Sequence, residues 1–400
     1  HDALPILIIM DTQNIPIHVR LWNKRFWALA LANLLLVMSS YMLIPVIPLR
    51  MMNDSSSWWQ IAAVLCSFFL GMYLLGGCSA YWVQQYRRKS VFVVSTLLLL
   101  AVTMSIYYLY KMQDGLTNYL LLILLRFIQG IFYGLSQMVL LGTLIIDTVE
   151  AVHRTEANQA ATWFGRFSIS LGPLLGLVVY HHFDFNTVLL LSCVCVILSL
   201  LLVELVRFPF RLPNEDLNHL SLDRFLLKGS HWLFLNIVLV TSILGALLSI
   251  EHNPLFYSLI MLGFLVALLA ERFAFADADL RSEAVTGLLV IGMSVLLMLT
   301  RRQASVGYIS PILIGLGYGV LGSRFLLFFI KLSGHCQRGT SQNTFLLAWE
   351  TGVGIGLAVS FGLFHCEHSY ILWFSLFVLC VSLIFYIGFV HSWYIKHKNR

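Results

Sequence analysis

The sequence predicts an all-α membrane protein with twelve transmembrane helices arranged as two six-helix bundles. Hydrophobic residues make up 59% of the 400-residue chain and charged residues only 11%. A soluble domain carries roughly 25% charged residues, because its surface must face water. Twelve apolar stretches also recur along the chain, each near the length of about 20 residues that crosses a hydrocarbon core. Together these observations exclude an ordinary soluble protein.

The apolar stretches are expected to be helices, because they are too long and too uniformly apolar for the strands of a membrane barrel. In the first half of the chain, the expected spans are Phe26–Leu49, Trp59–Val83, Val91–Tyr110, Tyr119–Ile146, Gln159–Tyr180 and Thr187–Val206. In the second half, they are Trp232–Ile250, Leu255–Ala270, Val285–Thr300, Tyr308–Ile330, Ser341–Phe364 and Tyr370–Val390.

The longest connection between spans, residues 207–231, divides the chain into two bundles, 26–206 and 232–390. A segment 1–25 precedes them and a tail 391–400 follows. Met10 is the expected natural start, because the residues before it lack the features of a secretory signal. A weak internal repeat supports the division, since an offset of 184 residues places Arg154 on Arg338, Arg166 on Glu350 and Gly172 on Gly356.

The distribution of Lys and Arg predicts the orientation in the membrane. If both termini are cytoplasmic, 18 of the 25 Lys and Arg residues lie in cytoplasmic segments. The outer loops then hold only Arg50, Lys111, Arg301 and Arg302. Such an excess on one side is typical of the cytoplasmic side. We therefore expect an integral multi-pass protein of the cell (inner) membrane with both termini inside.

The charge and cysteine patterns exclude several other classes. The formal net charge is +6, but the basic residues are scattered, so no nucleic-acid partner is expected. The seven cysteines show no metal-type spacing, and no disulfide framework is expected. No phosphate-binding loop occurs, so ATP hydrolysis by this chain is not expected. We expect no cofactor and no metal.

Charged side chains inside apolar spans are the first candidates for function, because each costs about 2.5–3.5 kcal/mol at the bilayer centre. Within the expected spans these are Arg126, Arg166, Arg324 and Glu350. Glu204 lies near a membrane edge and is expected to pair with Arg207. Three arginines against one carboxylate leave an excess of positive charge, which favours an anionic solute.

Glu350 is the only acidic residue deep in an expected span, and three interpretations of it remain open. Burial raises a carboxyl pKa and a nearby arginine lowers it, so Glu350 could bind and release a coupling proton. It could instead form a fixed ion pair with an arginine from another helix. The third interpretation is direct contact with the solute.

The three arginines and two asparagines are candidates for a substrate cavity. Arg126 and Arg166 could hold an anionic group with their guanidinium, or brace helices. Arg324 could also extend to the membrane surface. Asn33 and Asn236 lie at similar depths in the first and seventh spans and could bind a substrate or a neighbouring helix. The glycines of two later spans are expected to allow close helix packing; they are Gly315, Gly317, Gly319, Gly322, Gly352, Gly354 and Gly356.

Three motifs give the chain a resemblance to the major facilitator superfamily. The loop after the second span, Gly77 to Lys89, keeps the basic cluster Arg87-Arg88-Lys89 but has Gln84 and Gln85 where that family has an aspartate. The fourth span reads Arg126-Phe127-Ile128-Gln129-Gly130, which matches the family pattern R-x-x-Q-G. The fifth span contains Leu171-Gly172-Pro173-Leu174-Leu175-Gly176, similar to an element common in the antiporters of that family.

The resemblance implies a secondary transporter that rocks two six-helix halves around a central cavity. Gln129 joins the cavity candidates on this basis. The basic cluster, with Glu271 and Arg272 as its copy in the second half, is implied to form a cytoplasmic gate loop. Proton-coupled export of a small anionic or amphipathic solute is the leading expectation. The alternatives are a membrane-embedded transferase, for which His181, His182 and Asp184 are the best candidates, and a receptor that no longer transports.

Overall fold

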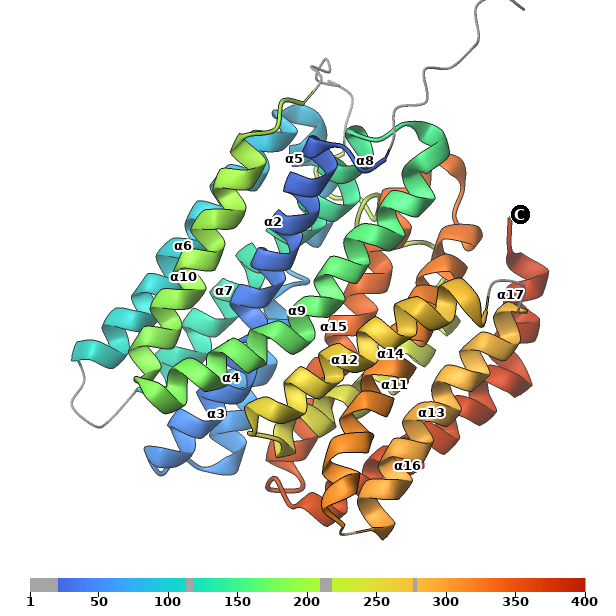
Figure 1. Cartoon of the computed structure of the whole chain (residues 1–400). Coiled ribbons are helices and arrows are strands. Elements are labelled where there is room, and N and C mark those ends of the chain that lie inside the picture. Colours follow the sequence, from blue (N-terminus) through green and yellow to red (C-terminus); the bar gives the residue numbers. More distant parts are fainter. Residues whose placement is uncertain (1–20, 113–117, 209–217, 276–278, 302, 400) are drawn as a thin grey trace, which may run out of the picture.

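The computed structural model describes residues 21–112, 118–208, 218–275, 279–301 and 303–399 (Figure 1). Within these residues, twelve helices are long and apolar enough to cross a membrane. They lie side by side in one bundle, as Figure 1 shows. The predicted fold class and the predicted number of spans are therefore confirmed.

The helices of the first six spans pack mainly against one another. They are α2 (Lys24–Tyr41) with α3 (Leu43–Asn53), α4 (Trp58–Gly71) with α5 (Gly76–Gln85), α6 (Arg88–Met112), α7 (Tyr119–Val139) with the π-helix η1 (Leu140–Leu144) and α8 (Ile145–Asp147), α9 (Arg154–His182) and α10 (Phe185–Glu204). Here α2 packs on α9 and α10, whereas α7 packs on α4 and α6.

The last six spans form a second set with the same kind of packing. They are α11 (His231–Ile250), α12 (Pro254–Phe273), α13 (Leu280–Thr300), α14 (Ala304–Leu332), α15 (Arg338–Gly362), and α16 (His368–Phe385) continued by the π-helix η4 (Tyr386–Val390) and α17 (His391–His397). In this set α11 packs on α15 and α16, and α14 packs on α12 and α13. The two sets meet chiefly where α4 contacts α15 and α9 contacts α12.

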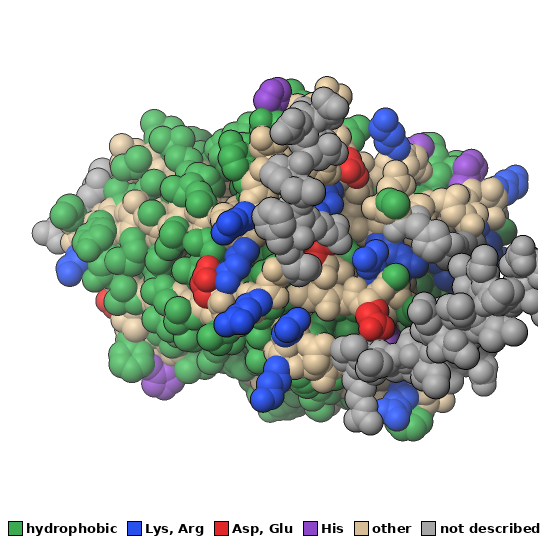
Figure 2. Space-filling model, turned by 90° about the horizontal axis from the view of Figure 1, so that it is seen from above, with side chains coloured by type: hydrophobic (Ala, Val, Ile, Leu, Met, Phe, Trp, Pro, Cys, Tyr) green, Lys and Arg blue, Asp and Glu red, His purple; other side chains and the backbone are tan. Residues whose placement is uncertain are grey.

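The two ends of the bundle differ in charge. Figure 1 places α5, α8, α17 and the C-terminus at one end, which we call the terminal end, and α3 at the opposite end. Figure 2 views the terminal end and shows Lys and Arg side chains gathered across it. The side surfaces are rich in exposed apolar side chains, such as Leu98, Leu201 and Phe377. Such a surface suits lipid, with the basic end in contact with anionic headgroups.

Several helices extend beyond the spans expected from hydropathy. The expected starts Gln159, Val285 and Ser341 become Arg154, Leu280 and Arg338. Hydropathy marks only the stretch that faces hydrocarbon, whereas a helix continues until its backbone is capped or solvated. This difference matters for charge, because Glu283 lies inside α13 and is only 1% exposed.

The first span is broken rather than continuous. It divides at Met42 into α2 and α3, just ahead of Pro45. A proline cannot donate a backbone hydrogen bond to the residue four positions earlier, which here is Tyr41. The break therefore falls at Tyr41, whose side chain is buried in the middle of the protein.

The internal repeat predicted from the sequence agrees with the structure. A short 3₁₀ turn, η2 (Ala151–His153), leads into α9 at Arg154, and another, η3 (His335–Gln337), leads into α15 at Arg338. The equivalent glycines have equivalent neighbours: a Cβ on Gly172 would lie 2.9 Å from Tyr41 of α2, and one on Gly356 would lie 2.0 Å from the Ser242 carbonyl of α11.

Glycines allow the closest helix contacts, as the sequence predicted. A Cβ on Gly315 would lie 2.2 Å from the Ile260 carbonyl, and one on Gly352 would lie 1.8 Å from Thr241. The same holds for Gly130, where a Cβ would lie 1.9 Å from the Phe68 carbonyl of α4. The glycine of the R-x-x-Q-G pattern is thus required by the approach of α4 to α7.

Replacing Gly130 with alanine should destabilise the protein, because the methyl group has no room against the α4 backbone. We expect Gly130→Ala to lower the free energy of unfolding by roughly 1–3 kcal/mol, seen as a lower melting temperature of the purified protein in detergent. Gly307→Ala is the matched control, since nothing lies within 4 Å of a Cβ at that helical position. Equal melting temperatures for the two variants would contradict the packing argument.

Candidate functional site

A small cavity lies between the two sets of helices. Its volume is about 20 Å³, which is room for about one water molecule. Most of its polar lining comes from α2, α7, α9 and α15, and one wall is apolar. The lining residues are Asn33, Val37, Gln137, Leu141, Thr162, Gly165, Arg166, Ile169, Phe345, Leu346, Trp349 and Glu350. The cavity therefore contains Arg166, Glu350 and Asn33, three of the residues selected from the sequence.

Glu350 lies at the middle of α15 and is only 3% exposed. Its Oε2 accepts a hydrogen bond of 3.1 Å from the hydroxyl of Tyr41, which belongs to the first set of helices. Among the residues that the structure describes, no Lys or Arg forms an ion pair with Glu350. The interpretation of Glu350 as half of a fixed ion pair is therefore wrong for this conformation, and its contact across the two halves was not predicted.

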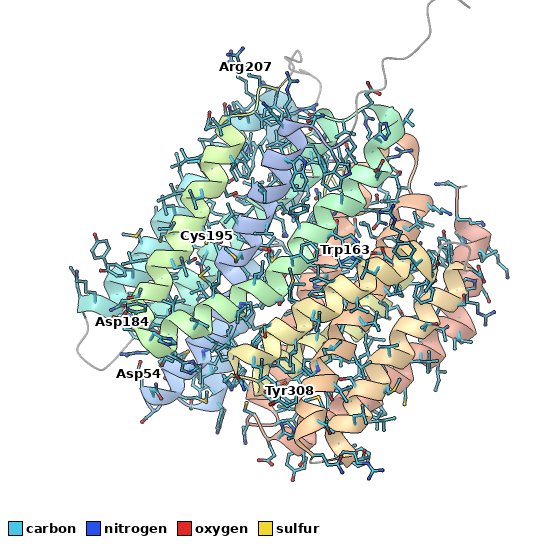
Figure 3. The ribbon with its side chains drawn as sticks, viewed as in Figure 1. Asp54, Trp163, Asp184, Cys195, Arg207 and Tyr308 are labelled. Carbon is cyan, nitrogen blue, oxygen red and sulfur yellow. The ribbon has the colours of Figure 1, made fainter. Side chains whose placement is uncertain are left out.

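Arg166 enters the cavity from α9 and also connects the two halves. Its Nη1 donates to the Gly319 carbonyl at 3.1 Å and to Ser323 Oγ at 2.7 Å, both on α14. Its guanidinium carbon lies 4.4 Å from the ring centroid of Trp163. Figure 3 shows Trp163 in the middle of the bundle, where α9 approaches the helices of the second half. The side chain is 2% exposed.

Further polar groups line the same cavity. Asn33 donates from Nδ2 to the Ala161 carbonyl at 2.9 Å, so it braces α2 against α9 while it faces the cavity. Thr162 accepts a hydrogen bond of 2.6 Å from Gln342 of α15. Neutral residues such as Gln137, Thr162 and Tyr41 carry no hydropathy signal strong enough to single them out. Only their depth within the spans, which is similar to that of Arg166 and Glu350, could have indicated them.

Arg126 and Gln129 lie elsewhere, away from the lining of this cavity. Arg126 Nη1 donates to Gln129 Oε1 at 2.5 Å, and Gln129 Nε2 donates to Thr103 at 3.0 Å. The guanidinium also lies 4.5 Å from the ring centroid of Phe68. This network joins α4, α6 and α7 within the first half. Here the R-x-x-Q-G residues brace helices instead of lining the cavity, which corrects the predicted placement of Arg126 and Gln129.

Arg324 and Asn236 are also engaged within one half. Arg324 forms an ion pair with Glu283 of α13, and Glu283 is almost fully buried. Asn236 donates to the Ser382 carbonyl of α16 at 3.1 Å. Glu350 is therefore not the only acidic residue inside a span, and the expected excess of positive charge is partly neutralised.

The predicted gate-loop residues lie at the terminal end of the bundle. Arg88 forms an ion pair with Asp147, and Lys89 pairs with Glu204 at 2.8 Å. The expected pairing of Glu204 with Arg207 is thus wrong, because folding brings Lys89 to it. Asp147 and Glu204 supply the acidic partners that Gln84 and Gln85 cannot.

The remaining gate-loop residues differ in exposure. Arg87 lies exposed in the connection between α5 and α6. In the second half, Glu271 is half-buried on α12, where its charge interacts with that of Arg166, whereas Arg272 is exposed near the ring of Phe273. The two copies of this loop therefore place their charges differently.

The connection between the two halves closes the terminal end. Ser221 N donates to the Gly77 carbonyl at 2.9 Å, while Arg224 N and Leu227 N donate to Thr340 and Thr344 of α15 at 2.9 and 2.8 Å. Phe225 packs over Gly76, where a Cβ would lie 2.0 Å from its ring. The connection thus binds both halves at once.

The opposite end is closed by direct contacts between helices. Ser170 of α9 donates to the Tyr257 carbonyl of α12 at 2.5 Å, and Trp58 stacks near Phe361 and His365. Contacts between the halves therefore lie at both ends of the bundle, with the cavity between them. A polar site at the interface of two six-helix halves is the arrangement found in secondary transporters.

The candidate enzymatic cluster has structural roles. Asp184 caps α10 by accepting from the backbone N–H of Thr187 at 2.8 Å. The Nδ1 of His182 lies 2.9 Å from the Val178 carbonyl within α9. Among the described residues, no group of three or more His, Cys, Asp or Glu side chains could hold a metal ion.

A twelve-helix bundle with a polar cavity between its halves is typical of one class of protein, the membrane transporters. The family model of the Major Facilitator Superfamily matches residues 29–395, which is nearly the whole chain. The protein therefore belongs to the Major Facilitator Superfamily, as its motifs indicated. No curated protein matches the sequence significantly.

Solved transporters share the fold at low sequence identity. The human organic anion transporter MFSD10 is 14% identical with a TM-score of 0.67, over 90% of this chain and 98% of its own. The nucleoside transporter NupG is 13% identical with a TM-score of 0.68, over 92% and 100%. A bacterial homologue of the iron transporter ferroportin is 16% identical with a TM-score of 0.63, over 91% and 98%. These likenesses establish the fold.

The buried ion pair of Arg324 and Glu283 should stabilise the fold only while both partners are present. Arg324→Gln leaves a buried carboxylate without its partner, which costs about 3–5 kcal/mol in comparable pairs. We expect Arg324→Gln to melt at a lower temperature than the wild type. The double variant Arg324→Gln/Glu283→Gln should regain much of the lost melting temperature. Thermal unfolding in detergent checks this, and a double variant no better than the single one would count against the pair.

His252, in the connection between α11 and α12, should make stability depend on pH. Burial lowers its pKa below the usual value, and the nearby charge of His181 lowers it further. Because the unfolded chain binds this proton more tightly, stability should fall as the pH drops below about 6.5. We expect His252→Gln to reduce the loss of melting temperature between pH 7.5 and 5.5, with the exposed His182→Gln as control. An unchanged pH dependence in His252→Gln would refute this role.

Proposed function

We propose that the protein is a secondary active transporter that carries a small solute through the central cavity by alternating access. Arg166 and Asn33 contact the solute in this proposal, and Glu350 carries a coupling proton. The observation that supports it best is the isolation of Glu350, a buried carboxyl in the cavity whose hydrogen-bond partner, Tyr41, belongs to the other half.

Because Glu350 forms no ion pair, closing of the cavity should depend on whether its carboxyl is protonated. A buried, ionised carboxylate that forms no ion pair is costly within a membrane-spanning bundle. Closure around Glu350 is therefore favoured when the carboxyl is protonated or when a ligand supplies a partner. Opening toward either side admits water, which stabilises the charged form and lets the proton leave.

The second support is that Arg166 and Tyr41 each contact the opposite half. Arg166 of α9 binds α14, and Tyr41 of α2 binds α15. In the closed conformation both groups bond to the opposite half of the protein. A solute that binds them in an open conformation therefore competes with these bonds. A ligand can shift the conformational equilibrium only through such differences between states.

The orientation and direction belong to the same proposal. Both termini face the cytoplasm of the cell (inner) membrane, supported by the basic terminal end shown in Figure 2. Arg87, Arg88, Lys89, Glu271 and Arg272 then act at the cytoplasmic gate. Proton-driven export by antiport is the proposed direction, supported by the antiporter-like sequence around Pro173.

Replacing Glu350 with glutamine should remove proton coupling while leaving the cavity nearly unchanged in shape. Solutes that raise the melting temperature of the purified protein would be tested for flux into proteoliposomes with and without a pH gradient. We expect the gradient to accelerate flux in the wild type, and to have no such effect in Glu350→Gln, which should still exchange solute across the membrane.

The control is Glu367→Gln, an exposed carboxyl at the opposite end of the bundle. It should keep the full response to the gradient. Gradient-driven flux of wild-type size in Glu350→Gln would remove the proton role of this residue. Failure of the wild-type protein to move any stabilising solute would count against transport itself.

A further inference from the structure

Only one side of the Arg166 guanidinium is hydrogen-bonded, and we call the other side, formed by Nε and Nη2, the open edge. Nη1 is bound to α14, whereas Nε and Nη2 have no hydrogen-bond partner among the residues that the structure describes. The side chain is nevertheless 2% exposed and lines the central cavity. We propose that this Nε–Nη2 edge binds a carboxylate of the solute, so that the transported compound is a small apolar monocarboxylate. This rests on the proposed transport function and names its substrate class.

The open edge has the geometry that a carboxylate fits. The Nε–H and Nη2–H groups of a guanidinium are parallel, and they match the two oxygens of a carboxylate in a bidentate pair. Unpaired buried donors are rare because they cost free energy. Two of them on one edge of a residue that lines a cavity favour a ligand over a packing role.

The guanidinium is held in place before any ligand arrives. The Gly319 carbonyl and Ser323 fix Nη1, and the ring of Trp163 lies 4.4 Å from the guanidinium carbon. On α14, the absence of a side chain at Gly322 makes room for it, since a Cβ there would lie 2.7 Å from Nε. Little rearrangement of Arg166 is then needed when a carboxylate binds.

The rest of the cavity limits what the carboxylate is attached to. Val37, Leu141, Ile169 and Leu346 line it with aliphatic groups, which suits a small apolar body. Glu350 shares the cavity, and whenever its carboxyl is ionised it disfavours a dianion such as a phosphate monoester. A single open edge on one arginine also matches one negative charge.

Two neutral groups offer additional recognition. Trp349 Nε1 is a buried donor close to the Tyr41 hydroxyl, and Asn33 Oδ1 is a buried acceptor without a hydrogen-bond partner in the described part of the chain. Both residues line the cavity. A hydroxyl or similar group beside the carboxylate could satisfy them, so hydroxy acids should bind more tightly than the unsubstituted acids.

The test is binding to the purified full-length protein in detergent at pH 7, measured by thermal shift and calorimetry. The probes are benzoate, phenylacetate and hexanoate, each compared with its uncharged amide. We expect the acids to raise the melting temperature and the amides to have no effect. Arg166→Gln should weaken binding of the acids roughly 10- to 100-fold, which is the range for hydrogen bonds to a charged group.

Three further variants test whether a loss of binding comes from the missing Arg166 contact and not from misfolding. Arg166→Lys keeps the charge but not the planar edge, and it should recover only part of the affinity. Gly322→Ala keeps the arginine but displaces it from α14, and it should also weaken binding. Lys396→Gln removes an exposed cation from α17 and should bind as the wild type does.

The outcomes separate this inference from the proposed function. Amides that bind as well as acids, affinity unchanged by Arg166→Gln, or no acid that binds at millimolar concentration would each overturn the carboxylate site. Arg166-dependent binding of acids that are then not transported in proteoliposomes would support the site and count against transport. Phenylalanine binding far more tightly than phenylpropionate would support the open edge, but would assign Glu350 to the ammonium group and not to a proton.

Discussion

The structure depends on one constraint, which is that lipid cannot hydrogen-bond to the protein. Every polar group within the spans must find its partner inside the bundle. Most do so by binding a backbone carbonyl of the next helix, as Ser192 and Ser199 of α10 bind the Ser39 and Ala32 carbonyls of α2. These bonds hold each half together as a unit. Arg166 and Glu350 differ from these residues, because both line the cavity between the halves and both bond to the opposite half.

The three arginines inside the spans illustrate how differently one residue type can be used. Arg126 bonds within the first half to Gln129 and lies near the ring of Phe68. Arg324 is neutralised by Glu283 within the second half. Of the three, Arg166 bonds across the boundary between the halves and lines the central cavity. Burial by itself therefore says little about function, and the distinction lies in which side of the boundary each partner occupies.

Hydropathy and charge distribution were sufficient to predict the fold class and the twelve spans, whereas the family was predicted from three motifs and the repeat that relates α9 to α15 from matching residue positions. They also selected Arg166, Glu350 and Asn33. They could not separate Arg126 from Arg166, because both are single arginines at similar depth. Only the packing shows that Arg166 lines the central cavity and that Arg126 does not. Glu283 was missed because the expected span began two residues after it. Tyr41, Gln137 and Thr162 were missed because neutral polar residues are common in membrane helices, and their importance comes from partners far away in sequence.

The described part of the connection between the halves is bonded on both sides. Toward α15 it has the backbone bonds of Arg224 and Leu227, a bond from Asn343 to the Arg224 carbonyl, and a bond between Thr340 and Asp223. Toward the first half it has the Ser221 bond to Gly77, the Arg224 bond to Thr143, and the packing of Phe225 on Gly76. Opening of the bundle at this end in the proposed transport cycle requires one of these two sets of contacts to break. Loss of the contacts to the first half would take the phenyl ring of Phe225 off Gly76.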